Sequence, residues 1–391
     1  MQSLKAVFDI GNGYVKWALI SEEEGKNIVL VKDMVKTKWM RKGKVLDAAE
    51  CLDSIQQVMQ TFFKKLWADF VDEVYITISH PNMIVTRFNE QKRIMSDKII
   101  GDDIDHLMKI VAEIAQQPNY EIIKLLPVHW IVDEQLTVAD PIAMEGRKLE
   151  LVADIFSIPK SFYTSLTELF DKININIADI TPNIVVASEL LLDFDQKDLG
   201  TLLIDIGYNQ TSYVVYENWY PLIYWVVPMW WEDVTKDISI WLQVDIKQAE
   251  TIKVETWLST DVQWDTDDRL DLSFLNNVIT ARYEEIFEMI NEHLIDVDKD
   301  GRLAWGVYLY GWWAKLTGVD EIAKNMFKLA TFYAKDHTMW LPELGNNLQL
   351  INLLGAYHWS EKYHQESKKW LWLWFSMDWA KWVWNFIKEI F

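Results

Sequence analysis

The chain has 391 residues, and half of them are hydrophobic, so it can bury a large core and divide into more than one domain. Lys and Arg total 38 against 59 Asp and Glu, which gives a formal charge of -21. This excess of negative charge disfavours contact with a phosphate backbone, so we expect no nucleic-acid partner.

The first residues and the lone cysteine predict a cytoplasmic protein. A strand pattern begins almost at once, without the basic and apolar segments of an export signal. Cys51 has no second cysteine with which to form a disulfide, as is usual in a reducing compartment. No stretch has the length of charge-free apolar sequence that spans a bilayer, so we expect any membrane contact to be peripheral.

The first predicted elements form an α/β unit. Apolar alternation from Lys5 to Ile20 predicts two strands joined by a turn at Gly11 to Gly13, and Ile28 to Val35 predicts a third strand. Apolar residues from Leu46 to Val71 recur at helical spacing, and Glu73 to Ser79 predicts the next strand. A helix that returns to a sheet is typical of α/β architecture.

The segment after a break at Pro81 has the pattern of an insertion. It holds a strand, a helix at Asp102 to Ala115 and further strands as far as Leu136. Helices are then predicted at Pro159 to Lys172 and at Thr181 to Leu192.

A second half follows with a hairpin at Thr201 to Tyr216. Helices are predicted at Thr235 to Leu242, Ile246 to Val254 and Phe274 to Leu294, before a strand at Val307 to Gly311.

One motif occurs in both halves. Residues 8–13 (FDIGNG) and 204–209 (IDIGYN) are the same strand-turn-strand device, which indicates a duplicated lobe. The glycine lets backbone amides turn inward to bind an anion, so two facing loops would clamp a polyphosphate. Asp9 and Asp205 would then hold a hydrated Mg²⁺ on the phosphates. A single loop of this kind is more often a plain hairpin turn, but two copies in corresponding places favour the nucleotide site.

A third element, from Tyr308 to Lys315, is a strand that enters a turn suited to an adenine ring. The alternative for this segment is an ordinary strand-to-helix connection.

These motifs resemble the nucleotide-binding signature of the actin and heat-shock-chaperone superfamily. The resemblance depends on the two Asp-Ile-Gly loops, on residues 249–253 (AETIK), and on Gly311 ahead of 314–316 (AKL). Within that superfamily, the segment from Leu125 to Glu150, with its LLP, IVD, DP and MEG groups, is similar to the inserted subdomain of the FtsA cell-division family. The resemblance extends from about Ala6 to Tyr357.

The resemblance implies an actin-like (ribonuclease H-like), duplicated two-lobe α/β fold with an FtsA-type inserted subdomain and a C-terminal amphipathic helix. The expected parts are subdomain 1A at 1–82, 159–196 and 344–366, inserted subdomain 1C at 83–158, subdomain 2A at 197–226 and 301–343, subdomain 2B at 227–300, and a linker with the helix at 367–391.

It also implies ATP and Mg²⁺ in the central cleft, with hydrolysis weak at most and no catalytic residue assigned. Asp9 and Asp205 are the expected metal ligands. The expected nucleotide contacts are Asp9, Gly11, Asn12, Gly13, Lys16, Gly207, Tyr208, Asn209, Gln210, Thr211, Glu250, Lys253, Gly311, Trp312, Trp313 and Lys315. For Glu250 and Lys253, the alternative is an ordinary i, i+3 pair on a helix surface.

The implied partners are the C-terminal peptide of the filament-forming GTPase FtsZ, further copies of the chain in a protofilament, and anionic lipid at the inner face of the membrane. The helix that contains Arg282 and Glu285 is expected to receive the peptide, and the alternative for this pair is an internal ion pair on a solvated face. Two other functions in the same superfamily stay open, a PilM-like pilus-assembly adaptor and a sugar kinase. No sugar-binding motif is visible.

The tryptophan content is unusual, with 22 tryptophans beside only 14 glycines. Where bulky indoles replace small residues in turns, they are expected to obstruct close backbone approach to a nucleotide. Either the protein has a blocked cleft and is a nucleotide-free scaffold, or UGA codons that the organism decodes as glycine have been translated as tryptophan. Trp130 is expected to be genuine. The positions at which a small residue is expected are Trp17, Trp39, Trp219, Trp225, Trp230, Trp231, Trp241, Trp305, Trp312 and Trp313.

The C-terminal segment from Trp379 to Phe391 predicts an amphipathic helix that lies in a membrane interface. Lys381 and Lys388 lie on its polar face. The alternative is a last helix packed on the body or on a partner. The residues of its apolar face are Trp382, Val383, Phe386, Ile387, Ile390 and Phe391.

Deletion of residues 381–391 should release the protein from anionic vesicles, because the apolar face supplies the buried area and the lysines the electrostatic attraction. Vesicle co-sedimentation measures this. A matched control replaces Asn385 by Ser on the polar face and should sediment as the full chain does. Full retention after the deletion would remove the tail as the main anchor.

Overall fold

The computed structural model describes most of the chain between Leu4 and Glu361. The described residues are 4–11, 13–23, 26–36, 40–41, 44–45, 57, 60, 73–172, 175–208, 210–227, 231–258, 272–314, 316, 318–334 and 350–361. The predicted C-terminal helix and almost all of the helix predicted at 46–71 lie outside these residues.

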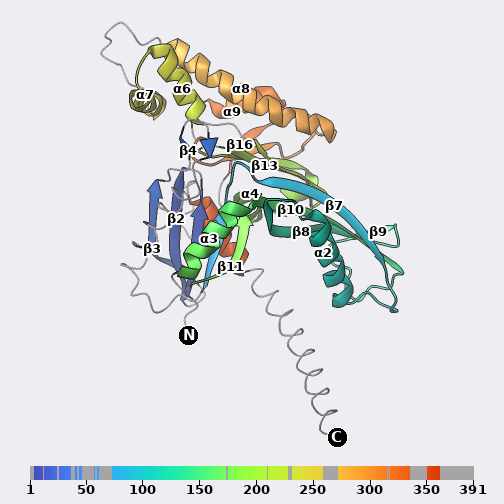
Figure 1. Cartoon of the computed structure of the whole chain (residues 1–391). Coiled ribbons are helices and arrows are strands. Elements are labelled where there is room, and N and C mark those ends of the chain that lie inside the picture. Colours follow the sequence, from blue (N-terminus) through green and yellow to red (C-terminus); the bar gives the residue numbers. More distant parts are fainter. Residues whose placement is uncertain are drawn as a thin grey trace.

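Two five-stranded sheets share one topology (Figure 1). In each, three strands pair antiparallel and two more follow in parallel. The predicted duplication is therefore confirmed. The first sheet has the order β3 (Lys26–Lys36), β2 (Tyr14–Glu23), β1 (Leu4–Ile10), β6 (Glu73–Ile78) and β11 (Asn176–Pro182). The second has the order β14 (Tyr220–Val227), β13 (Thr211–Glu217), β12 (Thr201–Ile206), β15 (Val307–Tyr310) and β16 (Thr331–Tyr333).

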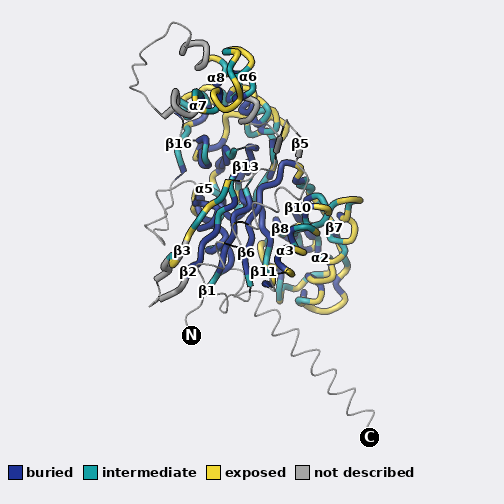
Figure 2. Tube along the Cα trace, turned by 60° about the vertical axis from the view of Figure 1, so that its left-hand side comes forward, coloured by how far each residue is buried: buried dark blue, intermediate teal, exposed yellow. Residues whose placement is uncertain are grey.

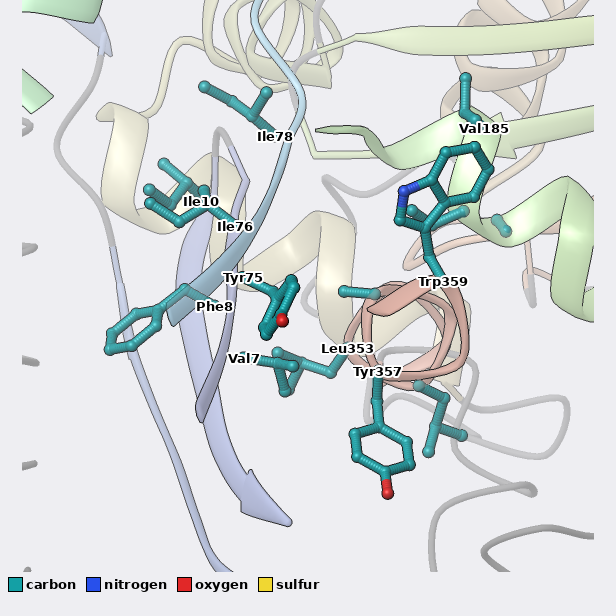
Figure 3. Packing of buried hydrophobic residues seen from close by; sticks show 14 of the residues in the cluster. Val7, Phe8, Ile10, Tyr75, Ile76, Ile78, Val185, Leu353, Tyr357 and Trp359 are labelled. Atoms are coloured by element: carbon teal, nitrogen blue, oxygen red, sulfur yellow. The ribbon is translucent and has the colours of Figure 1, made fainter. Parts of the chain in front are cut away.

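The first sheet is buried by helices from three distant parts of the chain. Its apolar residues form one core with α3 (Lys160–Lys172), α4 (Asn183–Leu191) and the helix at 351–361. Figure 3 shows Val7 of β1, Tyr75 of β6 and Leu353 of helix 351–361 converging between the strands and that helix. A helix near the C-terminal end of the described chain therefore completes the N-terminal lobe.

The second sheet carries its own helices, which gather at the end of the molecule away from the N-terminus (Figure 1). They are α6 (Trp231–Leu242), α7 (Ile246–Leu258), α8 (Leu272–Asp296) and α9 (Val319–Phe327). Tyr283 and Phe287 of α8 are fully buried against Leu309 of β15 and Phe327 of α9 in a second core. The short helix α5 (Phe194–Leu199) leads into β12. The two short strands β4 (Met40–Arg41) and β5 (Lys44–Val45) form a separate two-stranded sheet.

The insertion forms a third unit beside the first lobe. Its sheet has the order β7 (Ile84–Arg93), β10 (Lys148–Pro159), β8 (Tyr120–Val132) and β9 (Leu136–Val138), and α2 (Gly101–Ala115) covers one face. Trp130 of β8 is only 3% exposed in the core of this unit. Figure 2 shows buried residues concentrated in the strands of the lobes and exposed residues along α2 and the outer helices.

Some predicted helix boundaries were wrong, and α6 begins at Trp231 where Thr235 had been expected. The helix expected from Thr181 begins at Asn183, because residues up to Pro182 extend the sheet as β11. A residue that precedes proline is disfavoured in helical conformation, which explains the later start. Elements that had not been predicted include the strands β4, β5, β10, β11, β14 and β16 and the helices α5 and α9. Among the described residues, no helix is both long and apolar enough to cross a bilayer.

A hydrogen bond from Arg87, whose guanidinium is held by an ion pair within the insertion, ties the insertion to the second lobe. Arg87 donates to both carboxylate oxygens of Asp154 at 2.8 and 2.7 Å and to the carbonyl oxygen of Pro221 in β14 at 2.7 Å. Asp154 is 2% exposed, and burial raises the pKa of its carboxyl while the Arg87 hydrogen bond and charge act to lower it.

Replacement of Arg87 by Ala should lower the free energy of unfolding by about 3 kcal/mol, because it leaves a buried carboxylate without its partner. The unpaired carboxyl would bind a proton more tightly in the folded state than in the unfolded chain, so the loss should shrink as the pH falls. Denaturant unfolding at several pH values measures both effects. Arg302→Ala, which removes an exposed i, i+4 pair, should cost about 0.5 kcal/mol or less, and equal losses in the two variants would contradict the prediction.

Candidate functional site

The two Asp-Ile-Gly turns meet at the seam between the lobes. Each is closed by the same bond, from the Gly11 amide to the Tyr14 carbonyl at 3.1 Å and from the Gly207 amide to the Gln210 carbonyl at 3.0 Å. A Cβ placed on Gly13 would stand 2.5 Å from Cβ of Tyr208, so the turns touch. The structure therefore brings the two predicted loops together.

A hydrogen bond also crosses the seam beside the turns. The Gln210 side-chain amide donates to the hydroxyl of Ser79, which follows β6 of the first lobe. Gln210 is 3% exposed. The loop after β12 is thus fixed to the first lobe through a predicted contact residue.

Asp9 is fully buried, and both of its carboxylate oxygens accept a hydrogen bond. Lys16 lies opposite it in the β1–β2 register, and Nζ donates to Oδ2 of Asp9 at 2.6 Å. Asn183, at the start of α4, donates to Oδ1 at 3.0 Å and is itself held by the Thr77 hydroxyl at 2.8 Å. In this arrangement, Lys16 neutralises Asp9.

Asp205 is the second carboxylate of the seam. Burial and the nearby negative charge of Asp9 raise the pKa of Asp205 to about 7, against the lowering effect of Lys16. Gly311 has a φ of +105°, and a Cβ there would stand 2.5 Å from Oδ1 of Asp205. Only glycine fits at position 311, in the turn that follows β15, because a side chain there would collide with this carboxyl.

Glu250 and Lys253 form a buried network rather than lining this cleft. Lys253 is 1% exposed, and Nζ donates to Glu250 and to the Thr235 hydroxyl, each at 2.6 Å. Nζ also lies 4.8 Å from the centroid of the Trp313 ring, close enough for a cation–π contact. Burial acts to raise the pKa of Glu250, but the Lys253 charge and the hydrogen bonds outweigh it and lower the pKa.

The cleft has polar groups suited to phosphates and a cation, but no room for a nucleotide base. Its lining includes Asp9, Lys16, Asp205 and Gln210. The Thr211 hydroxyl is fully buried outside this lining and finds no hydrogen-bond partner among the described residues. The Trp312 indole, however, stacks on Tyr14 with centroids 4.8 Å apart and 15° between the rings. The cleft that they line holds about 60 Å³, whereas ligand pockets usually measure about 300–1,000 Å³.

Three polar residues of the cleft had not been predicted, namely Ser79, Asn183 and Asn352. Ser79 follows β6 and Asn183 follows β11, and these strands run parallel with β1. Since parallel strands end at one edge of a sheet, where ligands commonly bind, strand order would have indicated the first two. Asn352 comes from helix 351–361, and no local signal places it there.

The other predicted residues lie elsewhere. Arg282 of α8 donates to Asp237 of α6 at 2.9 Å and to Glu285 at 2.8 Å. None of these three residues lines the cleft. The structure does not describe Asn12, Asn209, Lys315 or the six tail residues that were predicted to face a membrane.

A family profile described as "SHS2 domain inserted in FTSA" matches residues 82–157, the inserted unit. The chain is similar to the cell division protein FtsA of Bacillus subtilis strain 168, with 27% identity over 342 residues that cover 82% of this chain and 76% of the relative. FtsA of Enterococcus faecalis is 24% identical over 347 residues, which cover 84% of this chain and 78% of the relative. These likenesses extend over both lobes and the insertion.

Solved structures share the fold at low identity. A PilM–PilN type IV pilus biogenesis complex matches with a TM-score of 0.62 and 15% identity, covering 90% of this chain and 98% of that one. MreB5 of Spiroplasma citri bound to ADP matches with a TM-score of 0.53 and 11% identity, covering 94% and 98%. The actin-like fold is thereby confirmed.

Replacement of Asp205 by Asn should flatten the dependence of stability on pH. The folded-state pKa of about 7 lies above the usual value of about 4 in an unfolded chain, so the folded protein binds the proton more tightly and loses stability as the pH rises from 4 to 7. Asn cannot ionise, so the variant should gain about 2–4 kcal/mol relative to the wild type between pH 4 and pH 8.

Denaturant unfolding across that interval measures the gain. Asp298→Asn, at a carboxylate whose side chain is 79% exposed, is the matched control and should follow the wild-type profile. Parallel profiles for the wild type and Asp205→Asn would contradict the burial of an ionisable carboxyl at the seam.

Proposed function

On the premise that this chain is a relative of the FtsA cell-division proteins, we propose that it is an actin-like adaptor that tethers FtsZ filaments to the inner face of the cytoplasmic membrane. The observation that carries the proposal is the FtsA-type insertion, β7 to β10, set within a duplicated two-lobe fold. The sequence likeness to FtsA proteins over both lobes supports the same role.

The seam supports a nucleotide-dependent state of this adaptor. Asp9, Asp205 and the two turns would hold the phosphates of ATP and its Mg²⁺, and the bound cation would supply positive charge between the lobes. Ionisation of Asp205, which burial opposes, would become favourable beside that charge. In such a state, the nucleotide would bridge the lobes and favour assembly of copies into a protofilament.

The proposed surface for the FtsZ C-terminal peptide is the part of α8 around Arg282. The Arg282 side chain is 30% exposed, and its ion pairs with Asp237 and Glu285 leave the guanidinium at the surface of α6 and α8. An acidic group of a peptide would take the place of Glu285 or Asp237 beside this oriented guanidinium. The tail would bring this surface to anionic lipid.

A PilM-like pilus-assembly adaptor is the second candidate, because the PilM–PilN complex shares the fold over 90% of this chain. The insertion profile and the likeness in sequence both favour the cell-division role. A sugar kinase has no observation in its favour among the described residues.

Co-sedimentation of the full chain with anionic vesicles and FtsZ, with and without ATP and Mg²⁺, tests the proposal. FtsZ should pellet only when the protein is present. Failure of the protein to bring FtsZ to vesicles in either condition would contradict the tethering role.

Arg282→Glu should weaken FtsZ recruitment by about tenfold, a change of about 1.4 kcal/mol, while vesicle binding stays unchanged. Arg302→Glu, at another exposed arginine, is the matched control and should retain FtsZ. In the exchanged variant Asp237→Arg, Arg282→Glu, the internal ion pair is restored with reversed polarity. Recovery of FtsZ binding in that variant would mean that Arg282 holds α6 to α8 and does not contact the peptide.

A further inference from the structure

The connection between β13 and β14 is a two-residue turn whose backbone favours glycine. Asn218 and Trp219 have φ values of +50° and +74°. Positive φ at both central residues defines the type I′ turn, for which Asn-Gly is the preferred sequence. The left-handed conformation costs a residue with a Cβ about 1–2 kcal/mol, so tryptophan is a poor occupant of the second position.

The turn is held in place by groups other than its side chains. The Asn218 amide donates to the Asp198 carbonyl at 2.8 Å, and the Trp219 amide donates to the Lys197 carbonyl at 3.1 Å. These bonds attach the turn to the end of α5 whatever residue stands at 219. The backbone conformation therefore persists, and the side chain has to fit it.

The Trp219 indole does not fit. Its ring centroid lies 3.0 Å from that of Phe194, with 64° between the planes. Aromatic pairs settle at about 4.5–7 Å between centroids. The positive φ and the close contact with Phe194 therefore both favour glycine at position 219.

Trp312 lies at the seam, where its indole lines the cleft. It follows Gly311, the residue that passes the buried carboxyl and at which a Cβ would stand 2.5 Å from Oδ1 of Asp205. The indole then covers Tyr14 and helps to reduce the cleft to about 60 Å³. Elsewhere the cleft keeps the polar groups of a binding site.

Other indoles divide into two groups. Trp241, Trp225 and Trp305 are 64%, 43% and 37% exposed, so none of them is a core residue. Trp130 and Trp359 are 3% and 4% exposed and belong to the cores, and Nε1 of Trp359 donates to Asp179 at 3.1 Å. Trp17 of β2 and Trp313, at both of which a small residue was expected, are 0% and 4% exposed and also belong to the cores. The packing of these four indoles is that of core residues.

We propose that residues 219 and 312 are glycine in the protein that the cell makes, because the organism decodes UGA as glycine where another variant code gives tryptophan. Glycine at 219 completes an Asn-Gly type I′ turn. Glycine at 312 removes the indole from the seam and opens the space beside Tyr14 to the base of a nucleotide. The second consequence rests on the proposed nucleotide-dependent function, whereas the first depends on the fold alone.

The coding DNA and mass spectrometry of the natural protein test the assignment. UGA codons and glycine-containing peptides are expected at 219 and 312, with UGG codons at Trp130 and Trp359. UGG at both 219 and 312 would overturn it.

Variants of the full chain test the physical reasons. Trp219→Gly should raise the midpoint of thermal unfolding by about 2–4 °C, whereas Trp130→Gly, the matched control, should lower it because it leaves a cavity in the insertion. Trp312→Gly should increase the affinity for ATP with Mg²⁺ at least about tenfold in calorimetry, and Trp219→Gly should leave that affinity unchanged. UGA codons together with no gain in affinity for Trp312→Gly would uphold the glycine assignment and overturn the nucleotide function.

Discussion

The structure depends on the burial of two carboxylates, Asp9 and Asp205, at one seam. Each ends the central strand of a five-stranded sheet, so the pairing of the lobes brings like charges together. Lys16 and Asn183 satisfy Asp9, but burial and the Asp9 charge leave Asp205 with a pKa near 7. The lobes therefore close on a site where positive charge is favoured, which is the electrostatic basis for a bound cation and phosphates.

The groups that surround the buried carboxylate differ between the two lobes. In the first lobe, side chains from β2 and α4 surround Asp9, and in the second a glycine turn approaches Asp205 closely. The insertion belongs to the first lobe by sequence, yet Arg87 fastens it to Pro221 of the second. A change in the separation of the lobes would strain this contact. The insertion thus contacts β14 of the second lobe through this hydrogen bond and through the ring contacts of His129 with Tyr220 and of Phe156 with Tyr224.

The tryptophans at 219 and 312 are unfavourable for two different reasons. Trp219 has a positive φ, which favours glycine, and the Trp312 indole stacks on Tyr14 in the lining of the cleft between the lobes. By contrast, Trp130 and Trp359 fill core space that a small residue would leave empty. The structure thus separates two classes of indole that the sequence presents as one.

The sequence alone determined the two hairpins and their duplication, because strand alternation and glycine turns are local properties. The break at Pro81 and the resemblance in sequence indicated the insertion, which was expected at 83–158 and which the family profile matches at 82–157. Pro182 also carried a local signal for the end of β11, although the helix had been predicted from Thr181. Only the tertiary structure decided that Ser79, Asn183 and Asn352 reach the seam, that Lys16 is paired with Asp9, and that Trp312 stacks on Tyr14. These contacts join segments from both halves of the chain, and strand order and lobe closure, which local pattern does not encode, set their distances.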